Sequence, residues 1–312
     1  MISTENVSKR YKNHLAVDSL NLDVRPGEIY GFLGPNGAGK TTTIQMLLNL
    51  TRPTSGRIML FGEPLEPRDF AYKRQIGVVA EEPFEFSHMT GWELIRYFVG
   101  LYGVAVPAQR MEELFRALDL WDVRHGLARD YSRGMRQKLS IIRALVHEPK
   151  LLILDEPVSG LDPHGIRQVR ELIQEYHQRG GTVFISSHIL SEIERAADRV
   201  GILDQGRLLV EDTLAGLRHR LIQSQQCSIE LESIPEGLLD RLRSEPYVLE
   251  LRQDGRQIDV TVQAQEDMRA PLSRLIAEAG GIILKMHSAE MSLEEAFVTI
   301  TSHNVAQLAG VA

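Results

Sequence analysis

The stretch Gly34-Pro35-Asn36-Gly37-Ala38-Gly39-Lys40-Thr41-Thr42 decides how the rest of the chain is interpreted. It matches G-x-x-x-x-G-K-[ST] and lies between a predicted strand, Ile29 to Leu33, and a helix predicted from about Thr41 to Leu50. In that context a glycine-rich loop curls its backbone amides around a phosphate, and the positive end of the following helix adds to the attraction. The sequence therefore predicts a phosphate site, with a strand-to-helix turn that binds no ligand as the alternative.

Two side chains at the end of this loop have chemistry that suits a nucleoside triphosphate. Lys40 is placed to span the β- and γ-phosphates, and the Thr41 hydroxyl is placed to hold Mg²⁺. The loop therefore predicts both halves of a metal–nucleotide site.

Two acids follow the apolar run Leu151 to Leu154. Asp155 and Glu156 emerge at the carboxyl end of this predicted strand, where α/β sheets bind ligands. Asp155 suits ligation of Mg²⁺ through a water molecule, and Glu156 suits the general base that orients and deprotonates an attacking water. An acidic turn after a buried strand explains the pair equally well when it is taken alone. Together with the phosphate loop, the pair predicts hydrolysis.

His188 follows a further apolar strand, Val183-Phe184-Ile185, and so reaches the same edge of the predicted sheet. There it can hydrogen-bond a γ-phosphate, although a lone histidine at such a position is often structural. We expect a catalytic role and keep the structural one open.

The bulk composition excludes several other classes of protein. A net charge of -7 and a pI near 5.8 argue against nucleic acid as the main partner. Cys227 is the single cysteine, so neither a disulfide within the chain nor a cysteine metal cluster is expected, which fits a reducing cytoplasm. The start Met1-Ile2-Ser3-Thr4-Glu5 lacks the pattern of a signal peptide, and no window is apolar for long enough to span a bilayer. If the chain works at a membrane, we expect another chain to cross it.

The order of predicted elements indicates two domains. Residues 1–221 alternate strands and helices, which predicts an α/β domain with a mainly parallel sheet, and a helical subdomain is inserted at about residues 82–147. Residues 222–312 show the order strand, helix, strand, strand, helix, strand of a small ferredoxin-like α+β domain. A last helix is predicted to open at Ser292, with Glu295 completing a capping box.

The segment Tyr131-Ser132-Arg133-Gly134-Met135-Arg136-Gln137, beside the motifs above, resembles the signature loop of the ATP-binding cassette (ABC) family. The family usually has Leu-Ser-Gly-Gly-Gln, so Ser132 and Gly134 match, whereas Arg133, Met135 and the aromatic residue before Ser132 depart. Variants of this form resemble a bacterial exporter branch. The resemblance implies a P-loop ABC cassette with a mixed sheet, in which Ser132, Arg133, Gly134 and Met135 contact the ATP of a second subunit.

The same resemblance, which covers roughly residues 2 to 220, implies further roles. Tyr11 is similar to the aromatic residue that stacks on adenine, although it can equally be a packing residue. Glu81 stands where the family commonly has a glutamine that senses Mg²⁺ and the attacking water; a carboxylate can ligate Mg²⁺ but adds negative charge near the γ-phosphate. The loop Ser159-Gly160-Leu161-Asp162 resembles the one that lies across the dimer interface.

These arguments give three sets of expected site residues. Nucleotide binding is expected at Tyr11, Gly34, Pro35, Asn36, Gly37, Ala38, Gly39, Lys40, Thr41 and Thr42. Catalytic roles are expected for Lys40, Glu156 and His188. Metal ligands are expected at Thr41, Glu81 and, through water, Asp155.

The resemblance implies an ATPase that uses ATP and Mg²⁺ and closes as a homodimer to drive a separate integral-membrane permease. It places the chain in the cytoplasm, on the inner face of the cell membrane, and favours export over import. Aromatic residues near Glu81 are candidates for a groove that receives a permease helix: Phe84, Phe86, Trp92, Tyr97 and Phe98.

Two other functions are weighed against transport. One is a soluble ABC ATPase that acts on the ribosome or DNA, which the acidic charge disfavours. The other is an ATP-binding regulator without turnover, which Glu156 disfavours. For the C-terminal domain, a folded spacer and a dimer brace or regulator remain equal alternatives.

Overall fold

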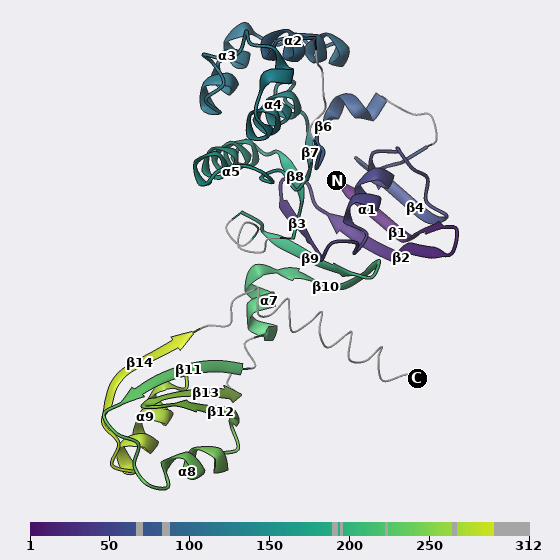
Figure 1. Cartoon of the computed structure of the whole chain (residues 1–312). Helices are drawn as coiled ribbons and strands as arrows, with labels where there is room; N and C mark the ends of the chain where they lie inside the picture. The colour runs from purple at the N-terminus through teal and green to yellow at the C-terminus, as the bar shows by residue number, and fades with distance from the viewer. Residues whose placement is uncertain are drawn as a thin grey trace. The chain divides into compact units, whose positions relative to one another are not determined.

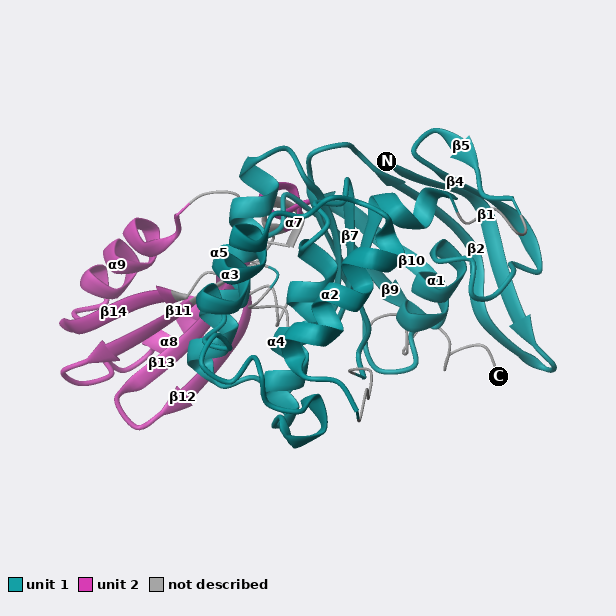
Figure 2. Cartoon of the chain, turned by 90° about the horizontal axis from the view of Figure 1, so that it is seen from above, with its two compact units in different colours: residues 1–212 teal, residues 213–312 magenta. Residues whose placement is uncertain are grey.

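A computed structural model describes residues 1–66, 71–82, 88–188, 193, 196–221, 224–263 and 267–289. The chain forms two compact units, Met1–Asp212 and Thr213–Ala312 (Figure 2). The helix predicted at Ser292 lies outside the described residues, as do Phe84 and Phe86 of the expected permease groove. No helix in these described ranges is long and apolar enough to cross a bilayer.

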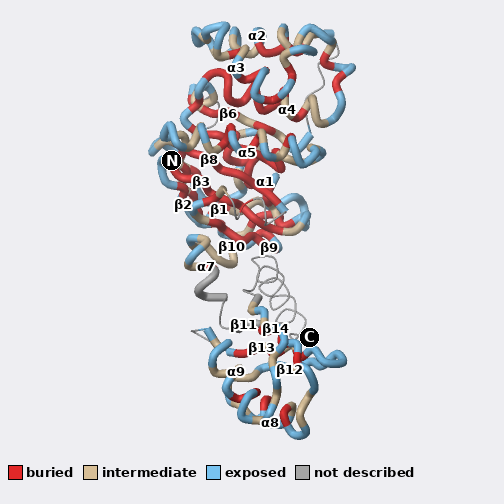
Figure 3. The backbone as a smooth tube through the Cα atoms, turned by 90° about the vertical axis from the view of Figure 1, so that its left-hand side faces the viewer, coloured by how far each residue is buried: buried red, intermediate tan, exposed pale blue. Residues whose placement is uncertain are grey.

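A six-stranded sheet in the order β10-β9-β3-β8-β7-β6 forms the centre of the first unit. Its strands are β3 (Ile29–Leu33), β6 (Ile76–Val79), β7 (Leu151–Asp155), β8 (Thr182–Ser187), β9 (Arg199–Asp204) and β10 (Arg207–Thr213). Four neighbouring pairs in this sheet are parallel: β6 with β7, β7 with β8, β8 with β3, and β3 with β9. Every residue of β3, β7 and β8 is buried (Figure 3), as strands covered on both faces require. Their carboxyl ends therefore meet at one edge of the sheet.

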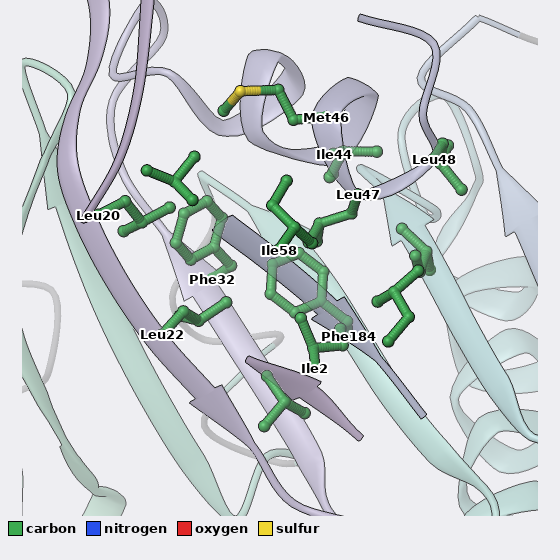
Figure 4. Packing of buried hydrophobic residues seen from close by; sticks show 14 of the residues in the cluster. Ile2, Leu20, Leu22, Phe32, Ile44, Met46, Leu47, Leu48, Ile58 and Phe184 are labelled. Carbon is green, nitrogen blue, oxygen red and sulfur yellow. The ribbon is translucent and has the colours of Figure 1, made fainter. Parts of the chain in front are cut away.

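A separate antiparallel sheet in the order β2-β1-β4-β5 packs on this core. Its strands are β1 (Ile2–Tyr11), β2 (His14–Val24), β4 (Ser55–Leu60) and β5 (Glu63–Pro64). Side chains from β1, β2 and β4 meet those of α1 (Lys40–Leu47) and of the central sheet in one apolar cluster (Figure 4). Its labelled members include Ile2, Leu22, Ile58, Leu47 and Phe184. The sequence predicted the central sheet but not this second sheet, because β1 pairs with β4 across about fifty residues of chain.

Helices fill the segment in which helical periodicity was predicted. They are α2 (Gly91–Tyr102), α3 (Ala108–Ala117) and α4 (Arg133–Leu145), which gather at one end of the first unit (Figure 1). Thr90 and Glu93 form a reciprocal capping box at the start of α2. The first unit also contains α5 (Pro163–Gln178), between β7 and β8, and the short turns η1 (Ala71–Gln75) and η2 (Ala128–Asp130). The mixed α/β cassette architecture predicted from the sequence is therefore confirmed.

Buried polar side chains attach the end of α4 to strand β6. The Arg143 guanidinium donates to the Val78 carbonyl at 2.8 Å, and His147 Nε2 lies 3.3 Å from the Ile76 carbonyl. The His147 ring stacks on Tyr102, with the ring centroids 3.7 Å apart. These bonds satisfy carbonyls of a sheet edge strand and fix the helix against it.

The second unit consists of α7 (Leu214–Leu221), β11 (Ser224–Leu231), α8 (Leu238–Ser244), β12 (Val248–Asp254), β13 (Gln257–Gln263), α9 (Arg269–Glu278) and β14 (Ile283–Ala289). Its four strands form an antiparallel sheet in the order β12-β13-β11-β14. This is the ferredoxin-like arrangement that the order of elements predicts. Cys227 is fully buried in the apolar core of this unit, and burial raises the pKa of its thiol. We keep residue 222, directly after α7, as our proposal for where the accessory domain begins.

His147 makes the stability of the first unit sensitive to acid. Burial lowers its pKa to about 4, whereas an unfolded histidine titrates near 6.5. Between these pH values the unfolded chain binds a proton at His147 that the folded chain does not, so stability is lost as the pH falls. We predict a loss of roughly 2 kcal/mol from this residue between pH 7 and pH 5.

Urea unfolding at pH 7 and pH 5 measures this loss. The variant His147→Phe keeps a ring on Tyr102 but cannot titrate, so it should lose less stability than the wild-type chain. The exposed His164 provides a control, and His164→Phe should keep the wild-type difference between the two pH values. Equal losses in His147→Phe and the wild type would contradict the prediction.

Candidate functional site

A cleft of about 400 Å³ lies at the carboxyl edge of the central sheet. This volume is in the range of small-molecule sites. Its lining comes from the β1–β2 hairpin, the phosphate loop with the start of α1, and the ends of β6 and β7. The lining residues are Tyr11, His14, Ala16, Asn36, Gly37, Gly39, Lys40, Thr41, Thr42, Glu81, Asp155 and Glu156.

The phosphate loop folds around the Lys40 side chain. The Lys40 ammonium donates to the carbonyls of Gly34 at 2.6 Å and Pro35 at 3.3 Å, and it is almost fully buried. Gly39 has a φ of 107°, and a Cβ there would lie 2.4 Å from the Ala16 carbonyl oxygen, so only glycine fits. Because α1 begins at Lys40, the positive end of the helix opens at the same loop.

Ser186 fixes the two acids at the carboxyl end of β7, Asp155 and Glu156. Parallel pairing sets Asp155 opposite Ser186, whose hydroxyl donates to Asp155 Oδ1 at 2.5 Å. The Glu156 backbone amide in turn donates to the Ser186 carbonyl at 3.2 Å. Glu156 has a φ of 48°, a left-handed conformation that non-glycine residues adopt rarely and often at functional sites. Ser186 was not among the expected site residues, although it directly follows the apolar run Val183-Phe184-Ile185.

The Glu156 carboxylate has a cationic or titratable partner at each oxygen. Oε1 lies 3.7 Å from the Lys40 ammonium, and Oε2 lies 2.8 Å from His188 Nδ1. An ionised carboxylate only accepts hydrogen bonds, so His188 carries a proton on Nδ1 in this arrangement. The side chain of Glu156 is 8% exposed, whereas that of His188 is 48% exposed. The structure thus brings together the three residues for which catalytic roles are expected.

The signature loop, residues 132–135, occupies another part of the first unit. Ser132 caps α4 by accepting a hydrogen bond from the Met135 amide, and the Arg133 guanidinium donates to the Ser159 hydroxyl. Asp162 caps α5 through the Gly165 amide. The signature loop and loop 159–162 therefore contact each other, and the described lining of the cleft includes neither.

The remaining predicted residues fall into two groups. Tyr11 and Glu81 line the cleft, and the Tyr11 ring is 43% exposed, with the Lys9 ammonium 4.9 Å from its centroid. Trp92 instead packs on Phe115, whereas Tyr97 is 46% exposed on α2. Among the described aromatic residues that were expected to line a permease groove, Tyr97 is therefore the most exposed.

The donor set of the cleft fits Mg²⁺. A hydroxyl at Thr41 and carboxylates at Glu81 and Asp155 are the oxygen ligands that this ion prefers. In the part of the chain that the structure describes, no cluster of three or more acidic, histidine or cysteine residues could hold a metal alone. In proteins Mg²⁺ usually combines one or two carboxylates with phosphate oxygens and water.

We predict that Ser186→Ala destabilises the chain by about 1–3 kcal/mol, because Asp155 keeps its buried charge and loses a donor. Urea unfolding at pH 7 measures the change. Ser140→Ala is a matched control, since the Ser140 hydroxyl donates only to the Arg136 carbonyl within α4. Its removal should cost less than the removal of Ser186, and equal losses would show that the bond to Asp155 has no special weight.

Comparisons with known proteins agree with this geometry. The family model of the ABC transporter matches residues 17–159, and a model of an AAA domain, described as a putative AbiEii toxin of a type IV toxin–antitoxin system, matches residues 127–194. Bacitracin transport ATP-binding protein BcrA of Bacillus licheniformis is 38% identical over 301 residues, which cover 96% of this chain and 97% of BcrA. Nod factor export ATP-binding protein I of Cupriavidus metallidurans is 34% identical over 309 residues, which cover 98% of each chain.

A dimeric structure of a bacterial ABC transporter cassette is also similar. It has 25% sequence identity and a TM-score of 0.64, and the match covers 69% of this chain and 99% of that one. The shared cassette fold, the phosphate loop and the near full-length relatives agree: the chain belongs to the ATP-binding proteins of ABC transporters.

Proposed function

We propose that the chain hydrolyses ATP to power a membrane transporter, of the exporting kind, whose spanning part is a separate polypeptide. The observation that carries this proposal is the meeting of Lys40, Asp155 and Glu156 in one cleft. A phosphate-binding cation, a metal-ligating acid and a candidate base are the parts that phosphoryl transfer to water needs.

In this proposal the phosphates of ATP lie in the loop of residues 34–42 and adenine stacks on the exposed face of Tyr11. Thr41, Glu81 and, through water, Asp155 hold Mg²⁺, which neutralises negative charge on the phosphate oxygens. Glu156 accepts a proton from a water molecule whose oxygen attacks the γ-phosphorus, and the bond to the ADP oxygen breaks. His188 keeps the carboxylate oriented through its bond to Oε2.

Lys40 has two competing partners in such a reaction. In the structure its ammonium lies 3.7 Å from Glu156 and is also bonded to loop carbonyls. A triphosphate carries more negative charge than one carboxylate, so it draws Lys40 away from Glu156. The Glu156 carboxylate then loses its cationic neighbour, which favours its acceptance of a proton from water. Nucleotide binding thereby prepares the base.

A second copy of the chain completes the site in this proposal. The signature loop does not line the cleft of its own chain, yet the start of α4 directs the positive end of a helix and the Ser132 hydroxyl toward the surface. The similar cassette structure is described as dimeric. We therefore expect two chains to enclose two ATP molecules, each site using the signature loop of the partner chain.

Coupling to a membrane permease rests on the relatives. One is named for bacitracin transport and another for Nod factor export, and both match nearly the whole chain. We propose that the chain works on the cytoplasmic face of the membrane and that the permease contacts the surface around Glu81 and α2, where Tyr97 is exposed. Closure of the dimer then moves the permease, because ATP binds the closed state better than the open one.

Replacing Glu156 by Gln should reduce the rate of phosphate release by about 100-fold or more, because the amide cannot accept the proton. Binding of ATP should persist, so the variant should form a stable dimer in ATP and Mg²⁺. Phosphate release and size-exclusion chromatography measure the two effects. Full turnover in Glu156→Gln would refute the proposed site. Wild-type turnover that is independent of chain concentration would refute the proposed dimer. Glu171→Gln, exposed on α5, is the matched control.

Glu81→Gln should raise the Mg²⁺ concentration needed for half-maximal phosphate release by about 3- to 10-fold, because an anionic ligand becomes a neutral one. A titration of Mg²⁺ at saturating ATP measures this shift. The neighbouring Glu82→Gln, outside the cleft lining, should leave the titration unchanged. An unaltered Mg²⁺ requirement in Glu81→Gln would exclude Glu81 as a ligand.

A further inference from the structure

Two side chains on one face of α4 are bonded to the segment that follows Glu156. The Arg133 guanidinium donates to the Ser159 hydroxyl at 3.2 Å, and Gln137 Nε2 donates to the Pro157 carbonyl at 2.9 Å. Arg133 and Gln137 are four residues apart and so lie one helical turn from each other. The Gln137 bond is buried, whereas the Arg133 bond is at the surface. The first two turns of α4 are therefore bonded to residues 157–159, once at the surface and once in the interior.

The Arg133 side chain also packs closely on loop 159–162. Gly160 has a φ of 75°, and a Cβ built there would lie 3.0 Å from Arg133 Nε and 3.1 Å from Cδ. A Cβ on Gly134 would lie 3.3 Å from the Gly160 carbonyl oxygen. The Arg133 side chain thus covers Gly160, and a side chain at position 160 would push against it. Arg133 and loop 159–162 fit each other in shape as well as in hydrogen bonding.

This contact reaches the carboxylate through one turn of backbone. The Ser159 amide donates to the Glu156 carbonyl at 3.1 Å, so residues 156–159 form a closed turn with Glu156 at one end and Ser159 at the other. The Glu156 end is held to Ser186 of β8 and the Ser159 end is held to Arg133. A turn fixed at both ends holds the Glu156 backbone in place and so fixes the direction in which its side chain leaves the chain toward the cleft.

We propose that Arg133 is a positioning residue for hydrolysis: it fixes the turn that carries Glu156 within its own chain, by holding Ser159 and covering Gly160. The proposal rests on the proposed ATP hydrolysis. It assigns to Arg133 a role that differs from contact with the ATP of a second subunit. In the positioning role, Arg133 acts through Ser159. In the contact role, it acts on the nucleotide and Ser159 is irrelevant.

A double-mutant cycle separates these roles. Arg133→Ala and Ser159→Ala should each lower kcat for phosphate release by about 3- to 10-fold. The KM for ATP should stay unchanged within about twofold. The double variant should be no slower than the slower single variant, because both changes break the same contact. Additive losses, a normal kcat in Ser159→Ala, or a raised KM with normal kcat in Arg133→Ala would overturn the proposal. Arg129→Ala is the control, since Arg129 is a nearby exposed arginine paired with Asp130.

Hydrogen exchange provides a readout that does not require turnover. Backbone amides of residues 156 and 158–161 should exchange about 3- to 10-fold faster in Arg133→Ala and in Ser159→Ala than in the wild-type chain. Amides of β7 should exchange at the wild-type rate, which shows that the variants are folded. Unchanged exchange in the turn would overturn the proposal even if turnover falls. A wild-type chain without turnover would refute the proposed hydrolysis, whereas the exchange data would still decide whether Arg133 fixes the turn.

Discussion

The parallel register of β6, β7, β8 and β3 is the constraint on which the rest of the cassette depends. Backbone pairing sets Leu154 between Val79 and Ile185, and it sets Leu33 beside Ser187. Each of these strands is mostly or wholly buried, so a slip by one residue would move every side chain to the opposite face of the sheet and break the close packing there. The residues that follow the four strands consequently emerge at one edge, and chemistry from four distant parts of the chain meets there.

The Glu156 carboxylate at this edge has a partner at each oxygen. Glu156 is buried beside Lys40 and is bonded to His188, and a buried carboxylate that loses a partner is costly. The same ammonium is the group best placed to receive phosphate. In the proposed reaction, the arrival of the triphosphate would therefore release the base.

Helix α4 connects the separate parts of the first unit. Its first turn carries the signature loop, its next turn bonds the segment after Glu156 through Gln137, and its far end bonds β6 through Arg143 and His147. A rigid helix fixed at three points transmits a displacement at one end to the others. The region that would sense a partner chain is thereby bonded to β6, the strand that precedes Glu81, and to the segment that follows Glu156. This connection gives a physical route from dimer closure to the cleft and to the surface proposed for the permease.

Local sequence by itself determined the phosphate loop, the acids after an apolar strand, the inserted helices and the ferredoxin-like order of the second unit. These features depend on spacing within a few tens of residues and on strand or helix periodicity, which a sequence displays directly. Only the tertiary structure decided that Ser186 holds Asp155, that Arg133 holds Ser159, and that β1 pairs with β4 in a second sheet. Each of these contacts joins residues 26 or more positions apart, and a serine or arginine at such a position carries no local sign of its partner. Their meeting is fixed by strand register and helix packing, which are properties of the folded chain.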